Sequence, residues 1–284
     1  MGRIFVIGDG LGVGATTIAV GLTKYLIDKG YAISLDRFGS DDRANDDFQL
    51  FKDLGFSREN APLTLDQISV PPTEGLIQII ELPHDTEIDV IHRQFEARIV
   101  YVQAMGTEKI APDESIIFLN RASESSVGVL MEDRCLASPR VIDLVGVSNA
   151  DVLVYSSEGQ NAICENIVAG AISHDPADDY FQRFANSAIV TRNGRVDLAL
   201  AAMLSGAKCL ILSGGGNPSP YILDRAASDR STTILLTKDS TVATLKNIQG
   251  AFGIAPFSGD EKIEKITQLF IDVIDDELVR ALTV

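Results

Sequence analysis

Short apolar runs alternate with helical patterns along most of the chain. The first apolar run, residues 4–7, is followed by a glycine-rich stretch and then by a helical pattern at 17–26. Runs of about four to eight apolar residues between helical patterns are typical of strands that are buried on both faces. The pattern therefore predicts an α/β fold, in which a parallel sheet is covered by helices on both sides.

A polar stretch at residues 156–161 interrupts this alternation. An apolar run at 151–155 precedes it, and the alternation restarts after it with a predicted helix at 163–171. A chain of 284 residues is long enough for two ordinary domains. We therefore expect residues 1–158 to form a first domain and residues 163–284 to form a second, smaller α/β domain.

Composition and charge narrow the classes of partner. Apolar residues make up 45% of the chain, so a sizeable core is expected and global disorder is not. The formal net charge of −16 disfavours nucleic acid or an anionic membrane as the main partner. There is no apolar run of membrane-spanning length and no signal-peptide pattern. The three cysteines lie far apart, which predicts buried, reduced thiols in a cytoplasmic protein.

The most informative motif lies between the first predicted strand and the first predicted helix. Residues 8–16 read GDGLGVGAT. Strand, glycine-rich loop and helix follow one another in this way in a P-loop, whose main-chain N–H groups bind phosphate. A P-loop normally ends in glycine, lysine and serine or threonine, but here Ala15 occupies the lysine position. Thr16 keeps the hydroxyl group that would bind Mg²⁺.

The missing lysine separates ligand binding from catalysis. The lysine normally brings positive charge to the transferring phosphoryl group, whereas the loop N–H groups bind phosphate without it. Lys24 lies about 13 Å further along the helix, so Arg37, after the second strand, is the predicted replacement cation. The alternative is a glycine-rich turn that binds nothing. The predicted ligand-binding residues of the loop are Gly10, Gly12, Val13, Gly14, Ala15, Thr16 and Thr17.

An acidic residue, Glu81, ends the apolar strand predicted at 75–82. A carboxylate in that position needs a partner, because burying an unpaired charge is very unfavourable. Mg²⁺ held together with Thr16 is one such partner. An ion pair with Arg37 is an equally well supported alternative.

The second domain offers one further candidate. Arg195 follows a predicted strand, where it could bind an anion at the carboxyl edge of the sheet. The alternative is purely structural, because Asp197 would stabilise the start of the next helix. The glycine run at 214–216 also ends a strand, and it fits either a ligand loop or a turn.

These motifs resemble known families. Residues 8–16 resemble the phosphate loop of dethiobiotin synthetase, with Ala15 at the lysine position. Arg37 then falls on a second lysine of that family, Glu81 on a glutamate that helps to hold Mg²⁺, and Asn120 on an asparagine near the nucleotide base. The resemblance implies ATP or another nucleotide, with Mg²⁺, as the ligand.

A second resemblance covers the rest of the chain. Residues 127–145 (VGVLMEDRCLASPRVIDLV) resemble a segment from the non-catalytic N-terminal half of long phosphotransacetylases. Residues 163–284 resemble the DRTGG domain of the same enzymes, on the strength of AIVTRNGRVD at 188–197, CLILSGG at 209–215 and TKDST at 237–241. The resemblance implies an accessory module that forms a homo-oligomer, most simply a dimer.

The favoured function is a regulatory protein that binds a nucleotide or another small anionic ligand without catalytic turnover. The alternative is an ATP-dependent ligase or phosphoryl-transfer enzyme of the dethiobiotin synthetase type, and Ala15 argues against it. Apolar positions of the predicted C-terminal helices could form the oligomer interface or pack on their own sheet: Ile263, Ile266, Leu269, Phe270 and Ile274.

Overall fold

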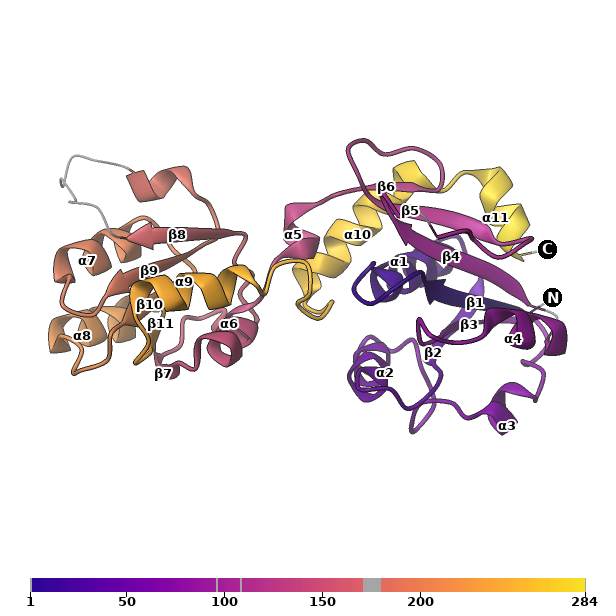
Figure 1. The fold of residues 1–284 in the computed structure, drawn as a ribbon, viewed down its shortest axis with the longest axis horizontal. Helices are drawn as coiled ribbons and strands as arrows, with labels where there is room; N and C mark the ends of the chain where they lie inside the picture. The colour runs from indigo at the N-terminus through magenta and orange to yellow at the C-terminus, as the bar shows by residue number, and fades with distance from the viewer. Residues whose placement is uncertain (1, 96, 108, 171–179, 284) are drawn as a thin grey trace. The chain divides into compact units, whose positions relative to one another are not determined.

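The computed structural model describes residues 2–95, 97–107, 109–170 and 180–283. The chain folds into two compact units (Figure 1). The first unit contains Met1–Asp133 and Phe257–Val284, and the second contains Arg134–Pro256. Both are built from strands and helices in alternation, which confirms the predicted α/β class.

The first unit contains a six-stranded sheet in the order β2-β3-β1-β4-β5-β6, and every strand pair in it is parallel. Its strands are β1 (Arg3–Gly8), β2 (Ala32–Arg37), β3 (Leu76–Glu81), β4 (Arg98–Ala104), β5 (Ile116–Ala122) and β6 (Val129–Met131). All residues of β1 are buried, because this strand lies inside the sheet and both of its faces are covered. The predicted parallel sheet is therefore present.

Helices cover both faces of this sheet. They are α1 (Ala15–Asp28), α2 (Ala44–Asp53), α3 (Leu65–Ile68), α4 (Ile88–Gln94), α10 (Asp260–Val273) and α11 (Asp276–Thr283). On one face, Phe5 and Ile80 of the sheet share a core with Ile68 of α3 and Ile91 of α4. On the other, Phe118 of β5 stacks on Phe270 of α10, with 6.2 Å between the ring centroids.

The second unit contains a five-stranded sheet in the order β7-β11-β10-β9-β8. Its strands are β7 (Asp151–Val154), β8 (Asn166–Gly170), β9 (Ser187–Arg192), β10 (Cys209–Ser213) and β11 (Thr233–Leu236). Its α-helices are α5 (Arg134–Ala137), α6 (Val141–Ser148), α7 (Val196–Leu204), α8 (Pro220–Asp229) and α9 (Thr241–Gln249), and its 3₁₀ turns are η1 (Gly159–Asn161) and η2 (Tyr180–Arg183). β8 to β11 are parallel neighbours, whereas β7 runs antiparallel to β11.

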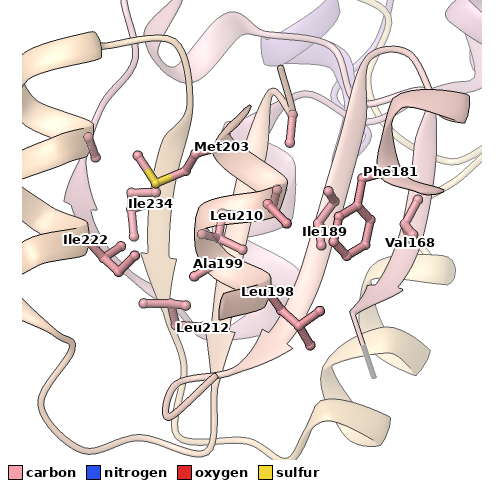
Figure 2. Packing of buried hydrophobic residues seen from close by; sticks show 14 residues of the cluster. Val168, Phe181, Ile189, Leu198, Ala199, Met203, Leu210, Leu212, Ile222 and Ile234 are labelled. Carbon is pink, nitrogen blue, oxygen red and sulfur yellow. The ribbon is translucent and has the colours of Figure 1, made fainter. Parts of the chain in front are cut away.

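Apolar residues on both faces of this second sheet are packed against helices. Figure 2 shows one face, where Ile189 and Leu210 of the sheet lie beside Leu198 of α7, and Ile222 of α8 lies near Leu212. The opposite face packs against Val141 and Leu144 of α6 and Ile248 of α9. The three cysteines are buried thiols, in agreement with the sequence.

The division of the chain differs from the boundary expected near residue 160. β7 pairs with β11, so residues 134–158 belong to the second unit. Residues 257–284 return to the first unit as α10 and α11. Both features depend on contacts between distant parts of the chain, which local hydrophobic patterns do not encode.

The helix expected at 163–171 is also different. Residues 166–170 form the strand β8, and η1 occupies part of the expected linker. A short apolar run is compatible with either a strand or a helix segment. Here the parallel pairing with β9 decides in favour of the strand.

The C-terminal helix α10 packs within the first unit. Ile266 and Phe270 are fully buried, and a Cβ atom placed on Gly21 of α1 would lie 2.5 Å from Phe270 Cε2 and 2.8 Å from Ile266 Cγ1. The apolar positions that pointed to an oligomer interface therefore include residues buried in the unit's own core. The expected homo-oligomer stays a prediction that depends on the family resemblance. Within the described residues, no helix is long and apolar enough to cross a membrane.

We expect Gly21→Ala to destabilise the first unit by about 1–3 kcal/mol, because the added methyl group overpacks the contact between α1 and α10. The matched control is Gly146→Ala in α6, where nothing lies within 4 Å of the added Cβ atom. A helical glycine with open space around it should gain about 0.5–1 kcal/mol on the same change. Urea unfolding followed by circular dichroism checks both. Equal effects of the two substitutions would contradict the packing of α10 on α1.

Candidate functional site

Residues 8–16, the glycine loop, connect β1 to α1 at the carboxyl edge of the first sheet. Gly12 and Gly14 have left-handed φ angles of 75° and 98°, and Gly14 is the N-cap residue of α1. A Cβ atom on Gly8 would lie 2.5 Å from Val13 Cγ2. Only glycine fits these positions without strain, so the glycines determine the path of the loop. Ligands bind at this edge in open α/β sheets.

The loop carries a run of unused hydrogen-bond donors. Within the described residues, the main-chain N–H groups of residues 10–17 donate no hydrogen bond, and the first to do so is that of Ile18, to Gly14 O at 3.0 Å. The first N–H groups of any helix lack a partner inside the helix. Here the run begins five residues before α1, because the loop is too tight to pair its own donors. Successive free N–H groups next to a helix N-terminus form an anion-binding site.

Side chains from outside the loop hold its carbonyl groups. Each of the following donates one hydrogen bond to a loop carbonyl: Asn120 Nδ2 to Val13 O at 2.8 Å, Arg121 Nη2 to Gly12 O at 2.5 Å, and Lys109 Nζ to Asp9 O. No peptide bond in the part of the chain that the structure describes is cis, and the C=O and N–H groups of a trans peptide point in opposite directions. The N–H groups of Gly10, Val13 and Gly14 therefore point away from these three side chains.

Thr16 and Glu81, the two predicted Mg²⁺ ligands, are in direct contact, and the metal itself stays a prediction. Thr16 Oγ1 donates a hydrogen bond of 2.8 Å to Glu81 Oε1. Glu81 is only 4% exposed, and within the described residues its Oε2 atom has no hydrogen-bond partner. Burial, reinforced by the charge of Asp47, raises the pKa of Glu81 to about 8, although Arg37 and the Thr16 hydrogen bond oppose the shift. Near neutral pH this carboxyl group therefore holds a proton unless a cation replaces it.

The buried, unpartnered oxygen of Glu81 fits a divalent cation. Mg²⁺ is typically held by one or two carboxylates together with the phosphates of its ligand. Thr16 and Glu81 would supply the protein's share of such a site, and the ligand would supply the rest. Within the described residues, no cluster of three or more histidine, cysteine, aspartate or glutamate side chains could hold a metal alone.

Arg37 ends β2, as the sequence predicted, and its guanidinium is engaged by acidic side chains. Its buried guanidinium donates to Asp41 Oδ2 at 2.6 Å and to Asp47 Oδ2 at 3.3 Å. It also donates to the main-chain oxygens of Phe38 and Glu81. Arg37 therefore contacts Glu81 through the Glu81 carbonyl, and within the described residues no ion pair joins it to the Glu81 carboxylate. These contacts hold Arg37 at the ends of β2 and β3.

Three residues at the site were missed by the sequence analysis, and Arg121, which donates to Gly12 O, is one of them. Lys109, in the connection between β4 and β5, contacts the loop although it belongs to no motif. Asp9 is buried inside the loop, and within the described residues its Oδ2 atom has no partner. Burial and the nearby charge of Asp9 raise the pKa of Tyr101. Loop connections that follow neighbouring parallel strands meet at one edge of the sheet, and this rule alone could have pointed to Lys109.

Arg195 lies in the second unit, as the N-cap residue of α7. Its guanidinium forms an exposed ion pair with Asp197 at 2.6 Å. The hydrogen bond from Arg195 lowers the pKa of Asp197 to about 2. Asp197 sits in the first turn of α7, as the structural alternative required. Anion binding by Arg195 stays a prediction.

The glycine run of the second unit differs from the glycine loop. Gly214, Gly215 and Gly216 have φ angles of 88°, 64° and 84°. The N–H groups of Gly214 and Gly215 donate to Asp239 O at 2.7 Å and Thr237 O at 2.9 Å. Because these donors are used inside the unit, the geometry favours the structural turn over the ligand loop.

Comparisons with known proteins identify the second unit. The family model described as the DRTGG domain matches residues 143–251, all of which lie within that unit. A crystal structure of the CBS and DRTGG domains of the regulatory region of Clostridium perfringens pyrophosphatase, complexed with the activator diadenosine tetraphosphate, is similar to this chain at 13% identity and a TM-score of 0.35. The match covers 52% of this chain and 70% of that one.

The protein is thus an α/β protein of two units that contains a DRTGG domain at residues 143–251. This confirms the predicted DRTGG domain, although the match begins earlier and ends earlier than the expected range of 163–284. The resemblance to phosphotransacetylases stays a prediction. The resemblance of the first unit to dethiobiotin synthetase stays a prediction.

We expect Gly14→Ala to destabilise the first unit by about 2–3 kcal/mol. The added Cβ atom would lie 2.2 Å from Asn120 Nδ2, so the substitution displaces the side chain that holds Val13 O, and it also strains a left-handed residue. The matched control is Gly30→Ala, where φ is 91° but nothing lies within 4 Å, so that only the backbone strain of about 1–2 kcal/mol applies. Thermal unfolding of both variants checks this. Equal losses would mean that Asn120 does not support the loop.

Proposed function

We propose that this chain is a regulatory protein whose glycine loop binds a phosphate-bearing ligand, most simply a nucleotide, without turning it over. The observation that carries the proposal is the run of N–H groups at residues 10–17, which have no acceptor within the described residues. Side chains fix the loop carbonyls on the other side, so the donors are already oriented before a ligand binds.

The same site lacks the usual means of phosphoryl transfer. Ala15 provides no charge to the transferring group, and Arg37 is engaged with Asp41 and Asp47. Phosphoryl transfer depends mainly on positioning and on charge stabilisation in the transition state. A loop that retains its N–H donors and lacks that lysine is suited to binding, and a binding site without turnover is suited to sensing a ligand.

Mg²⁺ would enter this site with the nucleotide. Thr16 and Glu81 are the protein groups that would hold it, and Mg²⁺ would neutralise part of the phosphate charge. Glu81 must lose its proton for this to happen, because its pKa is raised to about 8. Binding of the Mg²⁺–nucleotide complex near pH 7 should therefore release a proton, whereas binding of the free nucleotide should not.

A thermal-shift experiment tests the proposal. The protein is heated with ATP, ADP or AMP, with Mg²⁺ or with EDTA. A ligand that binds only the native state raises its stability by about 2.7 kcal/mol at a hundredfold excess over Kd. Thr16→Val is the matched variant, because it removes one hydroxyl group and keeps the shape, so it should lose only the Mg²⁺-dependent part of the shift. If no nucleotide shifts the wild-type midpoint at millimolar concentration, the glycine loop is a turn without a ligand.

The enzyme alternative is tested in the same preparation. A ligase or phosphoryl-transfer enzyme should release phosphate or ADP from Mg²⁺-ATP at about 1 s⁻¹ or faster with its second substrate. If the protein is regulatory, as proposed, the bound nucleotide should remain intact. Light scattering on the same samples, with and without nucleotide, tests the expected homo-oligomer and shows whether the ligand changes it.

A further inference from the structure

Lys109 is an exposed lysine with an unusually fixed position. It lies in the connection after β4, and its main-chain oxygen accepts a hydrogen bond of 2.7 Å from Nε2 of Gln103. Gln103 belongs to β4 and is buried, so the sheet itself anchors the backbone of Lys109. The lysine side chain then reaches the start of the glycine loop and donates to Asp9 O.

The ammonium group of Lys109 has N–H donors that its hydrogen bond to Asp9 O does not use. An ammonium group carries three N–H donors, and the bond to Asp9 O uses one of them. Within the described residues, Lys109 forms no ion pair with a carboxylate. A cation with free donors therefore stands at one end of the glycine loop, and the N-terminus of the 14-residue helix α1 stands at the other.

A second, independent observation indicates a charged ligand here. Glu81 is more than nine-tenths buried, bonds to Thr16 at the end of the loop, and has an unpartnered Oε2 atom within the described residues. A buried carboxyl oxygen without a partner is unfavourable in the protein alone. A polyphosphate that carries a divalent cation satisfies this oxygen and the loop donors together.

We propose that Lys109 supplies, from the connection after β4, the positive charge that Ala15 does not provide, and that the ligand carries at least two phosphoryl groups. This inference depends on the proposed function of the glycine loop. One phosphoryl group at the helix N-terminus can use the N–H groups of residues 14–17. A second one, nearer the start of the loop, is needed to bring phosphate oxygens to the Lys109 ammonium group.

A purely structural role for Lys109 gives different expectations. If the lysine only ties Asp9 O in place, its loss should weaken the loop for every phosphate ligand alike. If it contacts a second phosphoryl group, its loss should affect nucleoside di- and triphosphates but not monophosphates. The number of phosphates on the ligand therefore separates the two roles.

The experiment measures Kd for AMP, ADP and ATP by titration calorimetry at fixed ionic strength, with Mg²⁺ in excess. Lys109→Gln should weaken ADP and ATP about tenfold or more and AMP less than about twofold, since charge-assisted hydrogen bonds are the strong ones. Lys24→Gln is the matched control, because Lys24 pairs with Asp28 on α1 away from the loop, and its loss should change no Kd. Adding Ala15→Lys to the Lys109→Gln variant should restore ADP and ATP binding.

The possible failures are distinguishable. If the wild type binds none of the three nucleotides, the proposed function fails and this inference fails with it. If the wild type binds ATP and Lys109→Gln binds it equally well, only the role of Lys109 is overturned. Equal weakening for AMP, ADP and ATP would also overturn it, in favour of the structural role. Unchanged circular dichroism and thermal midpoints in the variant confirm that any loss concerns the site and not folding.

Discussion

Arg37→Met should reduce the free energy of unfolding by about 3–5 kcal/mol, because it removes the cation from a buried network. Arg37 is 4% exposed and donates to two carboxylates, those of Asp41 and Asp47. It also donates to two main-chain oxygens, those of Phe38 and Glu81. Methionine fills much of the same volume but leaves these acceptors without a donor. Urea unfolding at pH 7 measures the loss.

The control for this prediction is Lys24→Met. The Lys24–Asp28 pair has the same separation as Arg37–Asp41, 2.6 Å, but its side chains are 35% and 49% exposed. An exposed pair of this kind contributes about 0–1 kcal/mol. Arg37→Lys keeps the charge and loses the fork of donors, so its effect should be intermediate. If Arg37→Met and Lys24→Met were equally mild, the buried network would have no structural importance, and Arg37 would again be a candidate for contacting the ligand.

The outcome for Arg37 matters for function as well as for stability. An arginine paired with Asp41 and Asp47 holds the end of β2 against α2 and the segment that leads into it. Moving it to a phosphate would break its ion pair with Asp47, and burial already raises the pKa of that residue. The positive charge for a ligand must then come from elsewhere, and Lys109 and Arg121 are both cations that the fold brings to the loop.

Local features of the fold were readable from the sequence. β1, the glycine loop and α1 follow directly from an apolar run, closely spaced glycines and a helical pattern, because each is decided by residues near to one another. The contact of Thr16 with Glu81 was also expected, since both end up at the carboxyl edge of parallel strands. Neighbouring strands β1 and β3 bring them together.

Features that depend on contacts between distant parts of the chain could not be predicted from the sequence. Nothing local marks β7 as an antiparallel partner of β11, or α10 as a helix that returns to α1, and these two contacts moved the domain boundary. Lys109 lies 100 positions from Asp9, and only the strand order β3-β1-β4 places its connection beside the loop. The ion pairs of Arg37 with Asp41 and Asp47 were not predicted for a related reason, because no local pattern shows which of the nearby acidic side chains will turn toward Arg37.

The second prediction with a large expected effect is that Glu81 makes the stability of the folded protein depend on pH. Its folded-state pKa is about 8, above the value of 4.5 expected in the unfolded chain. A raised folded pKa means that the proton stabilises the folded state, so this contribution is fully present below pH 4.5 and is lost as the pH rises through 8. Relative to Glu81→Gln, which cannot ionise, the wild type should therefore lose about 3–5 kcal/mol of stability between pH 4.5 and pH 8–9.

Urea unfolding in EDTA across this pH range measures the difference between the two proteins. The charged groups that act on Glu81 are Asp47, Asp41 and Arg37, and all of them are kept in both. The matched control is Glu264→Gln, at an exposed position of α10. Its free energy of unfolding should follow that of the wild type at every pH. Parallel profiles for the wild type and Glu81→Gln would show that the buried carboxyl group does not hold a proton.

The same titration connects stability to ligand binding. Above pH 8 the Glu81 carboxylate is charged and destabilising in the free protein, and a cation held with Thr16 would remove that penalty. Mg²⁺–ATP should therefore bind more tightly as the pH rises from 6 to 8 and should flatten the loss of wild-type stability over that range. Glu81→Gln should bind Mg²⁺–ATP with little dependence on pH. If its affinity rises with pH as steeply as that of the wild type, another group provides the linkage, and the assignment of Glu81 to the cation is wrong.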